Sequence, residues 1–148
     1  MLKGRAKVIL LSLVLVLVLG TGTGWYYFYG PCGTKVIDGA ADQITSLLTR
    51  WLDAARLADT TSRIALSGPV SSLQQIRRDT DDIQVPSCLR LAKGHMVVGM
   101  DYAIDGFLLF MGEASDDQIS SRFDLAEASF GHVVQELTRI KECAPFCD

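Results

Sequence analysis

The stretch Ile37–Ala58, IDGAADQITSLLTRWLDAARLA, places apolar side chains at spacings that alternate between four and three residues. These positions are Ile37, Ala41, Ile44, Leu48, Trp51, Ala55 and Ala58. At this spacing they fall on one side of an α-helix and form a seam that packs lengthwise on neighbouring helices. The pattern therefore predicts a long helix that belongs to a helical bundle.

The stretch Ile119–Ile140, ISSRFDLAEASFGHVVQELTRI, repeats the pattern near the end of the chain. Its seam consists of Ile119, Phe123, Ala126, Phe130, Val133, Leu137 and Ile140. Ser115, with Gln118 three residues later, is typical of a capping box, which satisfies the free amides at the start of a helix. Pro145 marks the end of this predicted helix, because proline does not continue one.

Two prolines divide the middle of the chain. Pro69 opens a shorter helix that ends near Asp82, and Pro86 opens a long helix that ends near Gly112, because proline is favoured in a first helical turn. The second of these helices is apolar nearly all round, which predicts a central, buried position. The predicted fold class is all-α, an antiparallel up-down-up-down bundle of three long helices and one short helix.

Small residues line one side of the predicted central helix, at Ala92, Gly99, Ala103 and Gly106. A glycine costs about 1 kcal/mol in a helix interior, so its presence needs a compensating contact. Either a neighbouring helix approaches closely here, or a cleft for an apolar ligand lies beside Gly99 and Gly106.

The N-terminus carries an uncharged run from Val8 to Pro31, preceded by three basic residues and ending in an aromatic cluster. The basic residues are Lys3, Arg5 and Lys7. Residues 8–29 are long enough to span a bilayer, and basic residues before such a segment stay in the cytoplasm. We therefore expect a cytoplasmic stub and a transmembrane signal anchor over 1–31, in contact with the lipid bilayer through residues 8–29, followed by an extracytoplasmic domain over 32–148.

Two alternatives also place the domain outside the cytoplasm. Cleavage after a secretory signal, near Gly24, would release it. Lipidation of Cys32 would attach it to the membrane by an acyl chain. All three interpretations export the domain and differ only in what remains as a tether.

The charge of the exported part restricts its partners. Three of the 14 Lys and Arg residues lie in the stub, so the exported part carries 11 of them together with all 17 Asp and Glu. Its net charge is therefore about −6. Nucleic-acid recognition needs a basic face, so no nucleic-acid partner is expected. A polybasic attachment to anionic lipid is disfavoured for the same reason.

Four cysteines in an exported chain are more typical of disulfides than of a metal site. They are Cys32, Cys88, Cys143 and Cys147. In an up-down-up-down bundle all four fall at the pole nearest the membrane, and a disulfide needs Cα atoms roughly 4.4–6.8 Å apart. We expect Cys32 and Cys88 each to pair with Cys143 or Cys147, in an order that the sequence leaves open.

No set of residues in the chain predicts catalysis, a metal or another cofactor. His95 and His132 are expected at the same height of the last helical hairpin, without a third ligand in a recognised motif. Asp101 and Asp105 stand one turn apart, and we expect an ordinary ion pair with Arg122 rather than acid–base chemistry. The chain is therefore not predicted to be an enzyme.

A second apolar edge of the central helix is the predicted binding surface. It is formed by Leu91, Val98, Tyr102 and Leu109, and any part that the short helix leaves open would accept another protein. The predicted function is a protein-binding or scaffolding module at the membrane surface, whose protein partner the sequence does not identify. The alternative is a sensor or carrier that holds a small apolar ligand beside Gly99 and Gly106.

The middle of the chain, from Trp51 to Met111, resembles stretches of small exported, membrane-tethered helical bacterial proteins. The segments that carry this resemblance are WLDAA (51–55), RIAL (63–66), PV (69–70), LQQIRRD (73–79) and VPSCL (85–89). The resemblance implies export and a helical fold, and it implies no activity.

Overall fold

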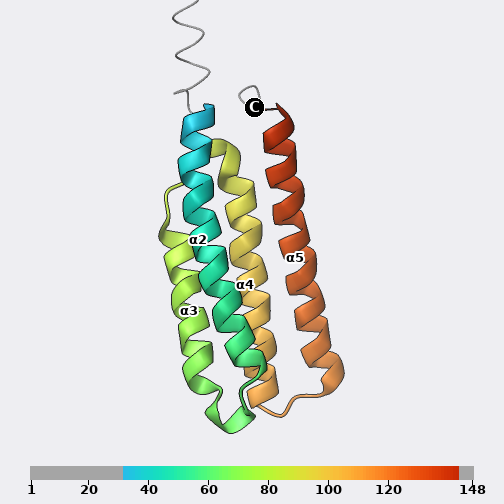
Figure 1. Ribbon diagram of the computed structural model, residues 1–148. Helices are drawn as coiled ribbons and strands as arrows, with labels where there is room; N and C mark the ends of the chain where they lie inside the picture. Colours follow the sequence, from blue (N-terminus) through green and yellow to red (C-terminus); the bar gives the residue numbers. More distant parts are fainter. Residues whose placement is uncertain (1–31, 144–148) are drawn as a thin grey trace, which may run out of the picture.

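The computed structural model describes residues 32–143 of the 148-residue chain as four α-helices and two 3₁₀ turns, with no β-strand in that range. The elements are α2 (Thr34–Asp59), η1 (Arg63–Ala65), α3 (Ser67–Asp82), η2 (Ser87–Leu89), α4 (Arg90–Met111) and α5 (Asp116–Cys143). Consecutive helices run in opposite directions and are joined by short connections (Figure 1). The predicted all-α class, with three long helices and one short helix, is confirmed.

The helix ends follow the local sequence signals. Pro69 lies in the first turn of α3, where its missing N–H has no helical partner to lose. At the start of α5, the Oε1 atom of Gln118 accepts hydrogen bonds from the Ser115 hydroxyl at 3.1 Å and the Ser115 N–H at 3.4 Å. One half of the predicted capping box is therefore present, the bond from the Ser115 N–H to the side chain of Gln118. Glu113, with φ 58°, makes the sharp turn between α4 and α5.

Helix α4 occupies the centre, as its composition predicts. It packs against α3 on one side and closely along α5 on the other. Its buried residues point in most directions around the helix: Ala92, Met96, Val97, Gly99, Met100, Ala103, Ile104, Gly106 and Phe107.

The buried face of α2 is rotated slightly about the helix axis from the face that the predicted seam defines. Its buried line is Ala40, Ile44, Leu47, Trp51 and Ala58. The predicted seam positions Ala41, Leu48 and Ala55 are only half-buried. The reason is that α2 packs on α3, so the half of its apolar stripe nearer α3 is buried and the other half faces α5 across open space.

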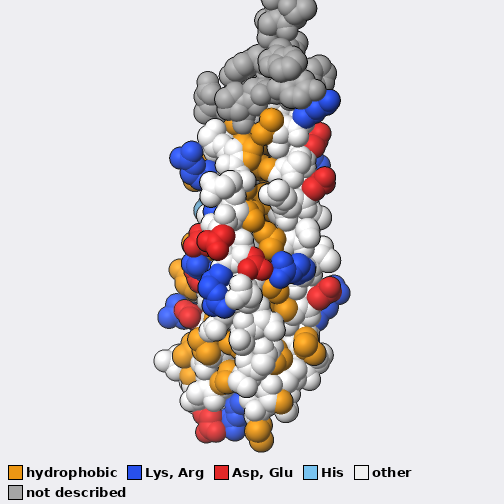
Figure 2. Space-filling view, turned by 90° about the vertical axis from the view of Figure 1, so that its left-hand side faces the viewer, with side chains coloured by type: hydrophobic (Ala, Val, Ile, Leu, Met, Phe, Trp, Pro, Cys, Tyr) orange, Lys and Arg blue, Asp and Glu red, His pale blue; other side chains and the backbone are white. Residues whose placement is uncertain are grey.

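Ion pairs connect α3 to both of its neighbours. Arg77 donates to both carboxylate oxygens of Asp101 on α4, at 2.7 and 2.9 Å, and these hydrogen bonds raise the pKa of Arg77. Arg50 of α2 reaches Asp79 at 3.0 Å. Figure 2 shows the side of the bundle where α3 lies, with charged side chains gathered near its middle. The expected pairing of Asp101 with Arg122 is wrong, because Arg77 approaches Asp101 from α3.

The predicted disulfide arrangement is also wrong in its pairing. Cys32 is bonded to Cys88, with Cα atoms 6.2 Å apart. Both residues lie at the same pole, as expected, but the link between α3 and α4 brings Cys88 directly beside the start of α2. Cys143 is the last residue of α5. Its side chain and the whole of Cys147 lie outside the part of the chain that the structure describes.

The expected transmembrane segment, residues 8–29, lies outside residues 32–143. None of the helices within that range combines the length and the apolar character needed to span a membrane.

Candidate functional site

The side of the bundle between α2 and α5 is open. Helix α5 packs tightly on α4, whereas few backbone positions of α2 and α5 approach each other. The two helices are nonetheless in contact through aromatic rings, because the centroids of Trp51 and Phe130 lie 6.3 Å apart. A groove therefore runs lengthwise over α4, with α2 and α5 as its walls.

The close packing of α5 on α4 depends on two glycines. A Cβ added to Gly99 would lie 3.2 Å from the ring of Phe130, and one added to Gly106 would lie 2.9 Å from the ring of Phe123. The two glycines and the two phenylalanines are each seven residues apart, so they pair in antiparallel order. The rings fill the space beside Gly99 and Gly106, where the sequence was also compatible with a cleft for an apolar ligand. The free apolar space lies between these rings and α2.

Three connected cavities make up the groove. The first, of about 300 Å³, lies nearest the pole of Cys32 and is bounded by Leu48, Trp51, Phe130 and Leu137. The second, of about 420 Å³, shares Trp51 and Phe130 with the first. The third, of about 290 Å³, shares Phe107 and Phe123 with the second. These shared residues make the three cavities one continuous groove.

The α2 wall of the groove is a second, mainly apolar seam on that helix. Its members follow the same alternation of four and three residues: Ala41, Thr45, Leu48, Leu52, Ala55 and Asp59. Leu52 is 46% exposed, which is unusual for a leucine in the middle of such a seam. Such a seam is the surface that a further helix packs against.

The α5 wall has the same periodicity. Its members are Phe123, Glu127, Phe130, Val134, Leu137 and Lys141. Val134 is 65% exposed and lies at the outer edge of the first cavity. On the floor of the groove, Phe107 of α4 meets Phe123 edge-on at 5.2 Å between ring centroids. The groove is thus apolar on its floor and along most of each wall, and the exceptions on the walls are Thr45, Asp59, Glu127 and Lys141.

Charged residues lie along the edges of the groove. Arg56 and Asp59 of α2 and Glu127 of α5 line the second cavity, and no ion pair joins them within residues 32–143. A bound segment would therefore meet apolar side chains in the centre and charges at the rim, which is the usual anatomy of a protein interface.

The predicted edge of α4 is only partly open. Leu91 is 60% exposed and Val98 is 44% exposed. Tyr102 and Leu109 are half-buried, and the Arg122 guanidinium of α5 lies 6.0 Å from the centre of the Tyr102 ring. The four residues therefore do not form one continuous free surface. That this edge binds a partner stays a prediction.

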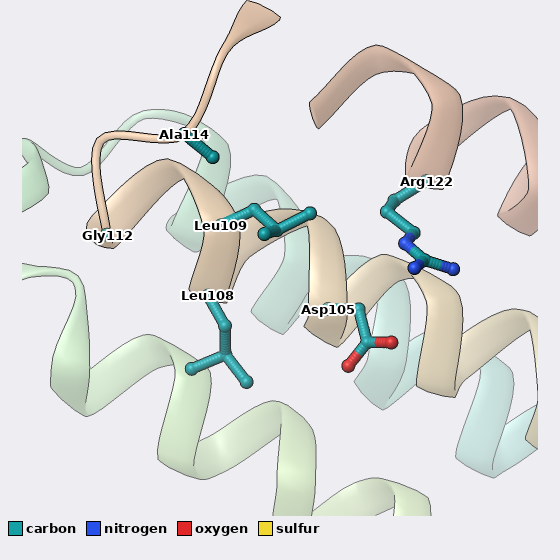
Figure 3. Close-up of a pocket in the computed structure, with 6 residues that line it drawn as sticks. All are labelled: Asp105, Leu108, Leu109, Gly112, Ala114 and Arg122. Atoms are coloured by element: carbon teal, nitrogen blue, oxygen red, sulfur yellow. The ribbon is translucent and has the colours of Figure 1, made fainter. Parts of the chain in front are cut away.

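A separate cavity of about 370 Å³ lies at the α4–α5 turn. Its lining mixes two leucines of α4, Leu108 and Leu109, with Asp105 and Arg122 (Figure 3). Asp105 and Arg122 come from facing helices and are the charged groups of this cavity. It is shallow and polar at one side, and nothing in it resembles a catalytic arrangement.

The two histidines lie together, as the hairpin register predicts. The ring centroids of His95 and His132 are 5.1 Å apart, and His132 Nδ1 lies 3.3 Å from Gln135 Oε1. Among residues 32–143, no group of three or more metal-ligating side chains is positioned to hold an ion.

Sequence reasoning placed most residues of the groove in helical seams but did not identify the groove. The signal was present in α2, whose apolar stripe is two residues wide at 40/41, 47/48 and 54/55. A stripe of that width can contact two neighbours, and among residues 32–143 α2 packs closely only on α3. Comparison of the chain with protein-family models, with curated proteins and with solved structures found no match.

Proposed function

We propose that the chain is a membrane-tethered, extracytoplasmic protein-binding module whose groove between α2 and α5 receives an amphipathic helix. The observation that carries the proposal is the pair of apolar seams, one on each wall, that no other helix covers within residues 32–143. Recognition of a helix in an apolar groove is a common mode of protein binding.

The shape of the groove favours a helix over a compact ligand. The groove residues of α5 run from Ile119 to Leu137, which are 19 residues with a rise of about 27 Å at 1.5 Å per residue. A helix of similar length would contact both seams along its whole extent. Exposed leucine and valine side chains at the edges, Leu52 and Val134, would become buried on binding.

The tether is proposed from the leader. The uncharged run from Val8 to Pro31 follows three basic residues, and a disulfide joins Cys32 to Cys88 directly after it. Disulfides persist in oxidising compartments, which supports export. The same bond argues against lipidation of Cys32, because its sulfur cannot carry an acyl group as well.

A second candidate function rests on the first cavity of the groove. Trp51, Met96 and Phe130 enclose part of its 300 Å³, and apart from Thr45 its lining is apolar. A small apolar molecule could occupy this space, which would make the chain a sensor or carrier. Such a ligand should raise the melting temperature of the full chain, and Phe130→Ala should abolish that increase.

The test of the proposed function is a photo-cross-linking amino acid placed at Leu52 of the full chain in native membranes. A matched control carries the same group at Leu57, which is 58% exposed and lies about 140° further around α2. We expect a protein adduct from position 52 and little from position 57. The absence of any protein adduct at position 52 would contradict the proposal.

A further inference from the structure

We infer that the helix received by the groove is α2 of a second copy of this chain, in a parallel dimer with a two-fold axis along the bundle. This inference rests on the proposed function of the groove. In a two-fold interface both copies use the same patch. The face of α2 that enters the groove of the second copy must therefore also be the wall of its own groove. The second seam of α2, which forms the α2 wall, meets that requirement.

The residues of this seam suit helix-to-helix packing. Ala41 and Ala55 flank a central pair, Leu48 and Leu52, at coiled-coil spacing. Small side chains at the ends let two backbones approach, while the leucines fill the middle. Leu48 is half-buried and Leu52 is exposed in a single copy, so contact with a second α2 would remove both from water.

Four charges near the rim can form two complementary pairs in the order that this arrangement requires. Asp38 and Arg56 are 18 residues apart, which is about five full turns, so they lie on the same side of α2. On α5, Glu127 lines the groove, and Lys141 lies 14 residues further along, on about the same side of that helix. The contact of Trp51 with Phe130 sets the relative height of the two antiparallel helices. Counting from it, Asp38 is level with residue 143 and Arg56 with residue 125.

A two-fold axis along the bundle keeps these heights between copies. Asp38 of one copy then lies near Lys141 of the second copy, and Arg56 lies near Glu127 of the second copy. None of the four takes part in an ion pair within residues 32–143. The two pairs have opposite polarity, so an antiparallel arrangement would place like charges together, and a shifted register would separate the partners.

The proposed tether acts in the same direction. Two copies anchored in one membrane meet with their bundles parallel, and confinement to the bilayer raises their effective concentration. Both conditions favour an interface whose symmetry axis runs along the bundle.

The test uses the full chain in native membranes with a cysteine at the centre of the seam. Leu52→Cys is treated with a short bismaleimide, with Leu57→Cys and the unsubstituted chain as controls. We expect a covalent dimer from Leu52→Cys at several times the yield of either control. A yield equal to that of Leu57→Cys would overturn the dimer.

Charge exchange tests the register. In the Leu52→Cys chain, Arg56→Glu should lower the dimer yield several-fold, and the further change Glu127→Arg should restore it. A double variant that stays as low as Arg56→Glu would overturn the parallel arrangement. If position 52 gives no dimer but does photo-cross-link to a different protein, the second copy is refuted and the proposed function is retained. If neither adduct forms, both are refuted.

Discussion

The ring of Phe123 lies on the bare Cα of Gly106: an added Cβ would stand 2.9 Å from the Cζ atom of that ring. Seven residues away, Phe130 covers Gly99 in the same manner. These two contacts hold α5 close to α4 and therefore away from α2. The two glycines thus allow close packing between α4 and α5, and they also help to keep the groove between α2 and α5 open.

Gly106→Ala should be destabilising relative to an alanine elsewhere in the same helix. Alanine gains about 1 kcal/mol in helix propensity over glycine. Overpacking a buried contact costs about 1–3 kcal/mol, which offsets that gain or exceeds it. Denaturant unfolding measures the difference.

The matched control is Gly94→Ala, because beyond its chain neighbours and its own helix backbone nothing lies within 4 Å of the Cβ position at this glycine of α4. It should raise the free energy of unfolding by about 0.5–1 kcal/mol. We expect Gly106→Ala to be less stable than Gly94→Ala by about 1–3 kcal/mol. Equal stabilities would show that Phe123 does not pack on Gly106.

Loss of the disulfide should destabilise the bundle strongly. The bond between Cys32 and Cys88 spans 56 residues of sequence, and closing a loop of that size contributes about 4 kcal/mol. Cys88→Ser and Cys32→Ser should each lose this contribution. The double variant should be no less stable than either single one, since all three remove the same bond.

The same series discriminates between pairings. If Cys32 and Cys88 were each bonded to a C-terminal cysteine, the double variant would lose two bonds and fall well below the single ones. Non-reducing peptide mapping should show the Cys32 peptide joined to the Cys88 peptide.

Arg77→Ala should weaken the contact of α3 with α4. Arg77 makes two hydrogen bonds to Asp101 and one to Asp81, but it is partly exposed, so the expected loss is roughly 0.5–1 kcal/mol. The neighbouring Arg78 donates to Gln75 within its own helix, and Arg78→Ala should cost less. Thermal unfolding at low and high salt measures both; an Arg77→Ala effect that does not shrink in 1 M salt would contradict an ion-pair origin.

The pKa of Asp79 should lie below the ordinary aspartate value. Hydrogen bonds from Gln75 and from Arg50 stabilise its charged form. Because the folded-state pKa is lowered, the associated stability is present above about pH 4 and is lost as the pH falls through the folded-state pKa.

An NMR titration of the Asp79 carboxyl group tests this. Gln75→Ala should move the pKa upward, and Arg50→Ala should do so as well, while Arg78→Ala should have a smaller effect. An Asp79 pKa at or above the ordinary value in the unsubstituted chain would contradict the hydrogen-bonded arrangement.

Several features of the fold follow from the sequence alone, because they depend on neighbours along the chain. The seams in Ile37–Ala58 and Ile119–Ile140, the positions of Pro69 and Pro86, and the cap at Ser115 specify four helices and their approximate ends. The near-uniform apolar character of α4 specifies its central place. Local hydrogen bonding and helical periodicity are sufficient for these predictions.

The tertiary structure determines which cysteines pair and where the candidate binding groove lies. Four cysteines at one pole are compatible with several disulfides, and only the lateral position of each helix brings Cys88, rather than a C-terminal cysteine, beside Cys32. Likewise, Asp101 could face Arg122 or Arg77 until the rotation of α4 is known. The groove exists because the packing of phenylalanine rings on glycines holds α5 against α4, while α2 packs on α3. The periodicity of a single helix cannot predict the outcome of such competing contacts.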